Sequence, residues 1–352
     1  MKFSDKVEKL KIRRVPYDPV LESYSFSDAL NRSNESYSKL NESSSIKYAI
    51  GVMQPIDPSY TKNTFNEGDR IKKHLEDKLP LKGITPEFRY QGSVTSDTHI
   101  LAHSDIDLLT IHNKFITIEP PRKATSPYKG NPIDDLVELR KESISILRKS
   151  FPSVTVDDSG SKSIALCGGS LKRKVDVVPS NWYDTNKYYE TGEECYRGVM
   201  ILDNETKTRP KNQPFLHNKK IDDRDALFCN NLRKSIRLLK SIKYDSDKTI
   251  KVSSYDIAAL AYCMPDRLLN VPHWYELMLV DNCVSHLQEV LGNVDYRNTL
   301  WVPDGSRKIF GTPGATVEGV RGLCSELTDL KKQIEADLGP SYRSINRSAI
   351  QY

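Results

Sequence analysis

The first clear amphipathic segment lies between residues 57 and 80. Asp57 suits an N-cap, Pro58 suits the first helical position, and Pro80 can end a helix because proline lacks the backbone N–H. Between these signals, apolar residues recur at helical spacing from Tyr60 to Leu79. The pattern predicts one long helix with a single apolar face.

Helix-like and strand-like patterns alternate after this helix. The predicted elements, in chain order, are a strand or turn with a Gly-Ser pair and a short helix, a strand over 105–111, a proline-rich loop over 114–132, a helix over 133–150, β-type runs at 153–158, 163–167 and 171–179, and helical stretches at 224–244, 253–265 and 315–340. Strands that precede and follow helices predict an α/β fold with a mixed sheet. We expect residues 1–185 to form N-terminal helices and this α/β core, and residues 186–352 to form a helical lobe.

Length and composition indicate a soluble globular protein. The chain has 352 residues, with 38% hydrophobic and 28% charged residues, so one bilobed unit or two domains is expected. No stretch approaches the roughly 18 apolar residues of a membrane span, and the first residues lack the apolar region of a signal peptide. We therefore expect a cytoplasmic protein without a membrane partner. Residues 21–50, rich in Ser and Asn, predict no function.

Cysteine spacing and net charge narrow the possible partners only a little. The six cysteines are scattered, without the close Cys/His grouping of a zinc site or the framework of a disulfide-rich domain. A net charge of +5 suits either nucleotide phosphates or nucleic acid. Basic clusters at 172–174, 207–211 and 219–220 could bind RNA or an acidic partner, but such charge runs are usually solvated faces.

Asp105 and Asp107 are separated by one isoleucine. In a strand, residues i and i+2 point to the same face, so these carboxylates project together while Ile106 and Leu108 turn into the core. Neighbouring carboxylates repel unless a cation lies between them, and oxygen ligands suit Mg²⁺. For this short motif alone, an exposed Asp-x-Asp on an edge strand is the more frequent interpretation.

Two further features favour the metal site. Gly92 and Ser93 precede the aspartates by a dozen residues, and a glycine followed by a helix start lets backbone N–H groups approach phosphate. Asp176 interrupts an apolar strand in which Val175 and Val177 face one side and Asp176 the other. If that strand lies beside residues 105–111, the three carboxylates converge and can hold two Mg²⁺ ions.

Gly-Ser, Asp-x-Asp and a later strand aspartate together resemble the signature of the polymerase-β-type nucleotidyltransferases. The segments "QGSVTSDT", "SDIDLL", "VDVVP", "LRKSIRLLKSIK" and "SSYDIAAL" make the chain similar to the bacterial CD-NTases, relatives of cyclic GMP-AMP synthase and the oligoadenylate synthetases. The resemblance covers roughly residues 90–264. It implies a polymerase-β-like lobe joined to a C-terminal helical lobe, with the active site in the cleft between them.

The resemblance also implies a substrate, a cofactor and a biological role. NTPs, ATP first among them, would be condensed into a cyclic di- or oligonucleotide with release of pyrophosphate, as a second messenger in antiphage defence. Two Mg²⁺ ions, for which Mn²⁺ can substitute, would serve the reaction. A protein regulator, or an effector that responds to the product, would be the partner.

Site residues follow from the matched motifs. Asp105, Asp107 and Asp176 would be the catalytic metal ligands. The residues expected to contact nucleotide are Gln91, Gly92, Ser93, Thr98, Arg233, Arg237, Lys240, Ser254 and Tyr255, with Tyr255 stacking on a base. For the basic residues of the helix over 231–244, a solvated charged face is an equally favoured alternative.

Some positions depart from the family pattern. Asp97 stands where many relatives carry glycine, and aspartate tolerates a positive φ better than most residues. The zinc insertion of the animal DNA sensor is missing, so activation by nucleic acid has no support. His99 and His103 are expected to be structural. The rival functions are a linear oligonucleotide synthetase, an end-adding transferase of the same fold, and an inactive scaffold that binds RNA or protein.

Overall fold

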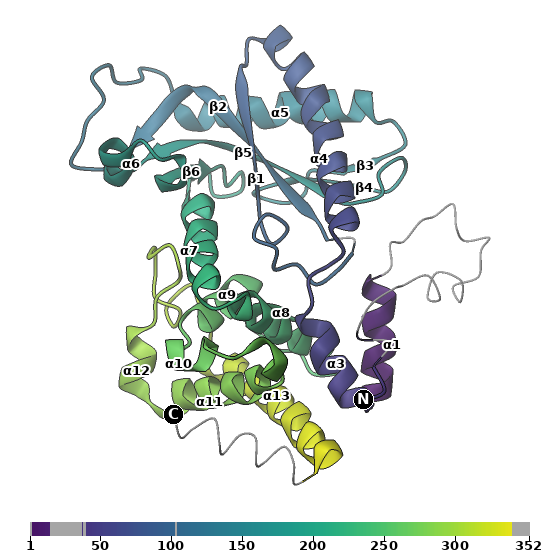
Figure 1. Cartoon of the computed structure of the whole chain (residues 1–352). Coiled ribbons are helices and arrows are strands. Elements are labelled where there is room, and N and C mark those ends of the chain that lie inside the picture. Colours follow the sequence, from purple (N-terminus) through teal and green to yellow (C-terminus); the bar gives the residue numbers. More distant parts are fainter. Residues whose placement is uncertain (1, 15–36, 38–39, 103, 340–352) are drawn as a thin grey trace.

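The computed structural model describes residues 2–14, 37, 40–102 and 104–339. It consists of a sheet with helices α4 and α5 beside it, and a helical part below (Figure 1). The helices of four or more residues are α1 (Phe3–Arg14), α3 (Ser44–Met53), α4 (Pro58–Lys78), α5 (Pro132–Ser150), α6 (Asn186–Thr191), α7 (Pro214–Leu227), α8 (Asn231–Tyr244), α9 (Ser254–Tyr262), α10 (Asp266–Leu269), α11 (Met278–Gly292), α12 (Val294–Thr299) and α13 (Val317–Leu338).

The sheet is mixed, as predicted. Its strands are β1 (Pro86–Gln91), β2 (Ile106–Ile118), β3 (Thr155–Asp157), β4 (Ile164–Cys167), β5 (Val175–Asp184), β6 (Arg197–Ile201) and β7 (Lys211–Asn212). The main order is β1-β2-β5-β4-β3, with β6 beside β5 and β7 beside β6. Only β2 and β5 run parallel, because α5, β3 and β4 intervene in the chain and return it in the same direction.

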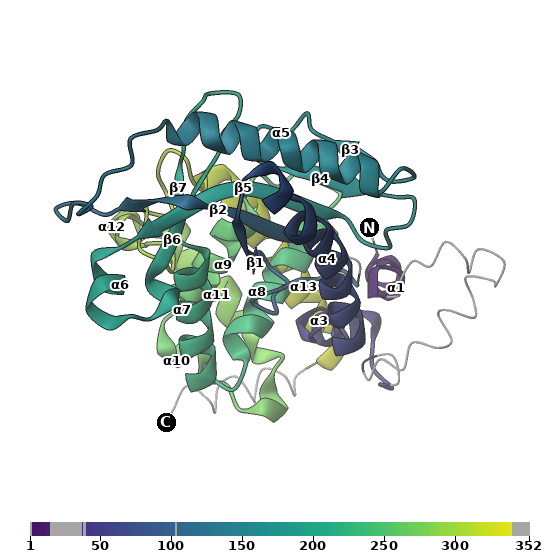
Figure 2. The same ribbon diagram turned by 90° about the horizontal axis from the view of Figure 1, so that it is seen from above.

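The two faces of the sheet have different neighbours. On one face, Ile106, Leu108, Val175 and Val177 are buried in a core shared with α4 and α5. Seen from above, α5 lies across this face (Figure 2). Alternate residues of β2 and β5, among them Leu109 and Val178, form a smaller cluster on the other face, against which α7 packs through Phe215. The predicted orientation of Ile106, Leu108, Val175 and Val177 is therefore confirmed.

The helical part has a separate and larger core. The N-terminal helices α1 and α3 contribute to this core together with α8, α9, α11 and α13. Arg13 of α1 and Tyr48 of α3 both bond the buried Asp245 carboxylate, at 2.6 Å in each case. The boundary at residue 185 stays a prediction, and this packing joins α1 and α3 to the helical core. None of the helices in the described ranges is long and apolar enough to cross a membrane.

Most predicted elements are confirmed, and four details are wrong. The predicted helices appear as α4, α5, α8, α9 and α13, and the three β-type runs as β3, β4 and β5. Residues 93–97 form a turn instead of a short helix. Strand β2 continues to Ile118, inside the predicted loop, and the helical half also contains β6 and β7. The stretch over 224–244 breaks into α7 and α8, because Cys229 and Asn230 adopt φ values of 51° and 67°.

Candidate active site

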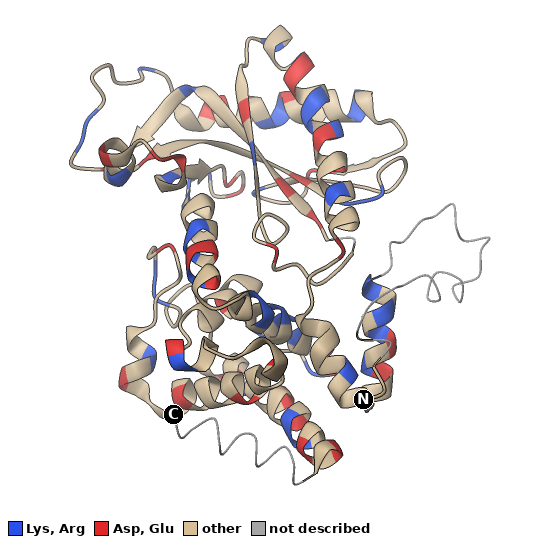
Figure 3. Cartoon of the chain, in the orientation of Figure 1, with Lys and Arg blue, Asp and Glu red and all other residues tan. Residues whose placement is uncertain are grey.

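The strand register brings the predicted aspartates together. Asp107 on β2 pairs with Asp176 on parallel β5 and with Gln91 on antiparallel β1. Paired residues on adjacent strands direct their side chains to the same face, which here is the face opposite α5. Asp105 lies just before β2, two residues from Asp107. We call Asp105, Asp107 and Asp176 the acidic triad. Acidic residues on the strands and basic residues along α8 gather where the two parts of the molecule meet (Figure 3).

A lysine ammonium lies between two members of the triad. Lys174 Nζ is 3.1 Å from Asp105 Oδ2 and 2.7 Å from Asp176 Oδ2. On the other side of Asp176, Ser163 Oγ donates to Oδ1 over 3.5 Å. The triad therefore already attracts a positive charge to the point where a metal ion was expected.

The electrostatics of the triad show why it needs that charge. Burial, followed by the charges of Asp176 and Asp105, raises the pKa of Asp107 to about 6. Burial alone would lower the pKa of Lys174, but its hydrogen bonds to Asp176 and Asp105 outweigh burial and raise it. The two carboxylates that Lys174 contacts thus favour its charged form.

The donor set of the triad fits a divalent cation of the Mg²⁺ class. Its ligands are carboxylate oxygens, which hard cations prefer, and the Lys174 ammonium stands in for the missing cationic charge. Among the described residues, no three His, Cys, Asp or Glu side chains are already spaced as a finished metal site. The Lys174 ammonium and the two carboxylates that it contacts thus form the arrangement that the structure shows at this point.

The loop that follows β1 lies against the triad. Gly92 has φ of 95°, and a Cβ atom at this position would stand 2.6 Å from Asp107 Oδ2. Only glycine combines this conformation with so close an approach. Thr95 Oγ1 donates to the Gly92 carbonyl at 2.7 Å, and the Thr98 N–H donates to the Ser93 carbonyl at 2.9 Å. These bonds curl residues 92–98, the Gly-Ser loop, into a compact turn.

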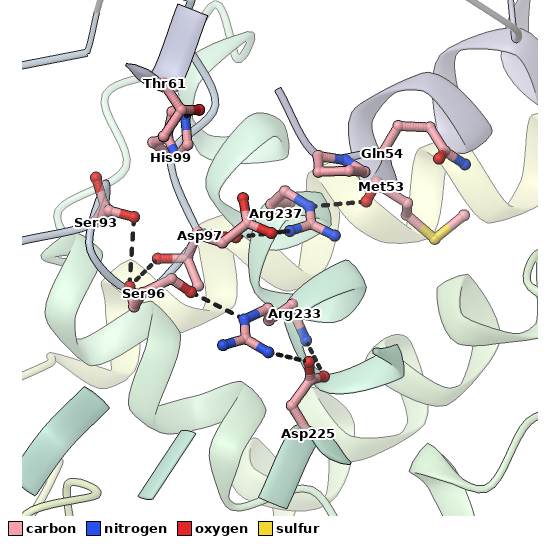
Figure 4. A network of polar contacts seen from close by, with 12 residues as sticks. Met53, Gln54, Thr61, Ser93, Ser96, Asp97, His99, Asp225, Arg233 and Arg237 are labelled. Carbon is pink, nitrogen blue, oxygen red and sulfur yellow. Dashed lines mark hydrogen bonds and ion pairs between the residues drawn. The ribbon is translucent and has the colours of Figure 1, made fainter. Parts of the chain in front are cut away.

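Three basic residues of α8 hold the Gly-Ser loop from the helical side, and Figure 4 shows two of them, Arg233 and Arg237. Arg233 Nε donates to the Ser96 carbonyl at 3.0 Å, and Arg237 Nη1 donates to the Asp97 carbonyl at 2.7 Å. Lys240 Nζ donates to the Thr98 carbonyl at 2.9 Å and to its hydroxyl oxygen at 3.1 Å. Consecutive carbonyls of the loop thus meet consecutive turns of one helix.

These contacts define what the α8 cations do in this structure. Arg237 and Lys240 are 2% and 7% exposed, so the alternative of a solvated face is wrong for both. Arg233 also pairs with Asp225 at 2.5 Å. Thr98, the last residue of the loop, is 2% exposed. Direct contact of these four residues with nucleotide stays a prediction, and the bonds described here make them supports of the loop.

Burial has a marked effect on the ionisable groups under the loop. Burial, and to a smaller extent the charge of Arg237, lowers the pKa of Lys240 to about 7. Burial and the surrounding cations also lower the pKa of His99 to about 4, and its Nε2 lies 3.1 Å from Thr61 Oγ1. His99 is thus a neutral link between the loop and α4, while His103 lies outside the described residues. Asp97, which stands where many relatives carry glycine, adopts a φ of 50°.

Ser254 and Tyr255 begin α9. The N-cap is Ser253, whose hydroxyl accepts from the Asp256 N–H at 3.0 Å, and Ser254 follows it with an exposed side chain. The Tyr255 ring stacks on His217 of α7, with the ring centroids 4.7 Å apart, and its hydroxyl donates to Asp304 Oδ2 at 2.6 Å. The Arg307 guanidinium also lies over the Tyr255 ring, 5.3 Å from its centroid. Tyr255 is therefore fixed by His217, Arg307 and Asp304, while Ser254 has its side chain open to solvent.

Several residues that contact the site carried no signal in the sequence. Asn212 Nδ2 donates to Gln91 Oε1 at 3.1 Å, and Asn218 Nδ2 donates to Thr95 Oγ1 at 2.9 Å. Both asparagines come from segments remote in sequence, so only the fold reveals them. The cluster at 172–174 was interpreted as a solvated face, which is wrong for Arg173, 4% exposed, and for Lys174.

Comparison with known proteins agrees with this geometry. The profile of the cGAS/DncV-like nucleotidyltransferase C-terminal helical domain matches residues 219–331. The cyclic dinucleotide synthase CdnE of Yersinia aleksiciae is 38% identical over 337 residues, which cover 90% of this chain and 88% of that protein. The chain belongs to the cGAS/DncV-like nucleotidyltransferases, or CD-NTases.

Solved structures of the family share the fold. The STING-associated CdnE c-di-GMP synthase from Capnocytophaga granulosa superposes with a TM-score of 0.74 at 28% identity, over 96% of this chain and 99% of that chain. A STING-associated CdnE c-di-GMP synthase from a Flavobacteriaceae species gives 0.76 at 26% identity, over 95% and 99%. The predicted bilobed, polymerase-β-like architecture is confirmed, and this superfamily generally uses divalent metal ions.

Proposed function

We propose that this protein is a Mg²⁺-dependent nucleotidyltransferase that joins two NTPs into a cyclic dinucleotide and releases pyrophosphate. The observation that carries the proposal is the pairing of Asp107 with Asp176 on parallel strands, beside a glycine whose backbone lies against Asp107. The relatives named as cyclic dinucleotide synthases support the product class. A cyclic oligonucleotide would need the same site.

The acidic triad is proposed to hold two Mg²⁺ ions. Bound there, the ions neutralise the triphosphate and lower the pKa of the attacking hydroxyl group. Asp105 and Asp107 take the cation on the donor triphosphate, while Asp176, which Ser163 orients from β4, lies beside the attacking hydroxyl. Burial, and then repulsion from Asp176 and Asp105, raises the pKa of Asp107, and a bound cation would relieve that repulsion.

The Gly-Ser loop is proposed to bind the donor phosphates through the backbone at Gly92 and Ser93, with Gln91 at its edge. Transfer of a nucleotidyl group depends mainly on positioning and on charge neutralisation, so the loop must be rigid. Helix α8 is proposed to keep the loop rigid, because its side chains donate to the loop carbonyls of Ser96, Asp97 and Thr98. Ser254 is then proposed to donate to the triphosphate, and Tyr255, whose ring is already contacted by His217 and Arg307, is proposed to stack on a base.

The wider role follows from this chemistry. Cytoplasmic NTPs, ATP first among them, are the proposed substrates, and Mn²⁺ is the proposed substitute for Mg²⁺. The residue ranges 1–185 and 186–352 are proposed as the two lobes that close on the substrates, with α1 and α3 packed into the second and with β6 and β7 paired to the sheet of the first. The product is proposed to activate an effector in antiphage defence, since similar synthases are described as STING-associated.

The experiment compares the purified protein with its Asp107→Asn variant in the presence of all four NTPs and Mg²⁺. We expect pyrophosphate release and a product with the mass of two nucleoside monophosphates less two water molecules, both lost in the variant. A product that retains a triphosphate would favour the linear synthetase. Unchanged NTPs with every divalent metal would favour the inactive scaffold.

A further inference from the structure

Lys174 is anchored in the fold by its backbone, which leaves its side chain free to move. Its carbonyl accepts from the Ile106 N–H at 3.3 Å, so its main chain lies beside the start of β2, one residue before Val175, which is the strand partner of Ile106. It precedes Asp176 by two residues, and its side chain therefore faces the same way as that carboxylate. The main chain presents this lysine to the acidic triad whatever the side chain does.

The contact that the ammonium makes is open on one side. The side chains of Lys174, Asp105 and Asp176 are 38%, 52% and 13% exposed. Because the lysine side chain is flexible and its head is strongly hydrated, it can leave the carboxylates for water without crossing the core. The contact can therefore form and break while the sheet stays intact.

The lysine and a metal ion require the same atoms. Lys174 Nζ is bound to Asp105 Oδ2 and Asp176 Oδ2, the oxygen atoms through which one cation could link the two strands of the site. An ammonium and a divalent ion at that point would also repel each other. Occupancy by one therefore disfavours occupancy by the other.

We propose that Lys174 is a built-in counter-ion, which holds the acidic triad together before metal arrives and is displaced when a divalent cation binds. The proposal rests on the proposed function, in that the triad is the metal site. Lys174 is a positioning residue in this account. Lys174 competes with bare metal ions for the triad. The site therefore favours a metal ion that arrives with a nucleotide, because the nucleotide phosphates supply further ligands.

Direct metal binding tests the proposal without any turnover. Mn²⁺ is titrated into the full-length protein in the absence of nucleotide, and free Mn²⁺ is measured by its electron paramagnetic resonance signal. Lys174→Gln should bind Mn²⁺ about threefold to tenfold more tightly than the wild type, the range expected for releasing a partly exposed ion pair. Lys174→Arg, which keeps the charge, should stay close to the wild type.

Lys172→Gln is the matched control. Lys172 is exposed and forms no ion pair within the described ranges, so its loss removes the same charge without touching the triad. Its Mn²⁺ affinity should stay within about twofold of the wild type, because salt screens a distant charge. Far-UV circular dichroism confirms that each variant is folded.

The outcomes separate the two proposals. Equal or weaker Mn²⁺ binding by Lys174→Gln, with normal binding by the wild type, overturns the role of Lys174 and leaves the metal site standing. An equal gain in Lys172→Gln also overturns it, because bulk charge would then explain the effect. If Asp107→Asn binds Mn²⁺ as well as the wild type, the triad is not the metal site and both proposals fail.

Discussion

Replacement of Lys240 by methionine tests how α8 holds the Gly-Ser loop. Methionine keeps most of the length and apolar character of the side chain but removes the ammonium that donates to the carbonyl and hydroxyl oxygens of Thr98. In the wild type, burial and the charge of Arg237 lower the pKa of Lys240 to about 7, against 10.5 for an ordinary lysine. The variant lacks this titration.

The sign and size of the effect follow from proton linkage. Between pH 7 and pH 10.5 the unfolded chain holds a proton on Lys240 that the folded chain has largely released, so the free energy of unfolding rises with pH. Integrated from pH 7 to pH 9, a folded pKa of about 7 gives a gain of about 2 kcal/mol. Below about pH 6, Lys240 is protonated in both states and adds no slope.

Urea unfolding of the wild type and of Lys240→Met at pH 5, 6, 7, 8 and 9 measures the effect. The difference in unfolding free energy should be flat up to about pH 6 and should then increase in favour of the wild type. Lys240→Gln restores a hydrogen-bond donor but does not titrate. It should be more stable than Lys240→Met, and its difference from the wild type should depend on pH in the same way. Parallel curves for the wild type and both variants would refute the account of Lys240 as a buried, desolvated support.

Three further substitutions test the triad, the loop and α9. Asp107→Asn should abolish product formation and most of the stabilisation by Mg²⁺ with nucleotide. Its melting temperature in EDTA should be unchanged or higher, because repulsion within the triad falls. A melting temperature below that of the wild type would contradict this. Gly92→Ala should lower the free energy of unfolding by about 1–3 kcal/mol and the turnover rate more than about tenfold, since the added Cβ displaces Asp107. The control is Gly168→Ala, at φ of 72° with open space around it, which should lose the same stability but keep the wild-type turnover rate. Ser254→Ala should weaken NTP binding about tenfold in a calorimetric titration, while Ser253→Ala, at the N-cap, should instead lose about 1 kcal/mol of stability; the reverse pattern would exclude Ser254 as a phosphate ligand.

The elements that the sequence predicted well are those with local signals. Asp57 and Pro58 begin α4 as expected, and the Asp57 carboxylate accepts from the Ser59 N–H at 2.8 Å. The break between α7 and α8 had no such signal. Cys229 is a residue that seldom adopts a positive φ, so the pattern of apolar residues continued across a turn that only tertiary packing explains.

The same distinction holds for the site. Asp176 was recognisable because a carboxylate in an apolar strand is costly unless it has a task, and its pairing with Asp107 follows from the parallel register. Lys174 was assigned to a solvated cluster, because its contact with Asp105 joins positions 69 residues apart. The support that Thr98 receives from Lys240 spans 142 residues, and no local pattern records it.

The chemical form of the product tests the central claim most directly. Purified protein is incubated with ATP labelled with ³²P at the α-phosphate, the other NTPs and Mg²⁺, and the products are treated with alkaline phosphatase before separation. A cyclic dinucleotide has no terminal phosphate, so we predict one labelled product that keeps its mobility and is absent with Asp107→Asn. A labelled product that changes mobility on phosphatase treatment, or a ladder of longer products, would contradict the proposed cyclisation.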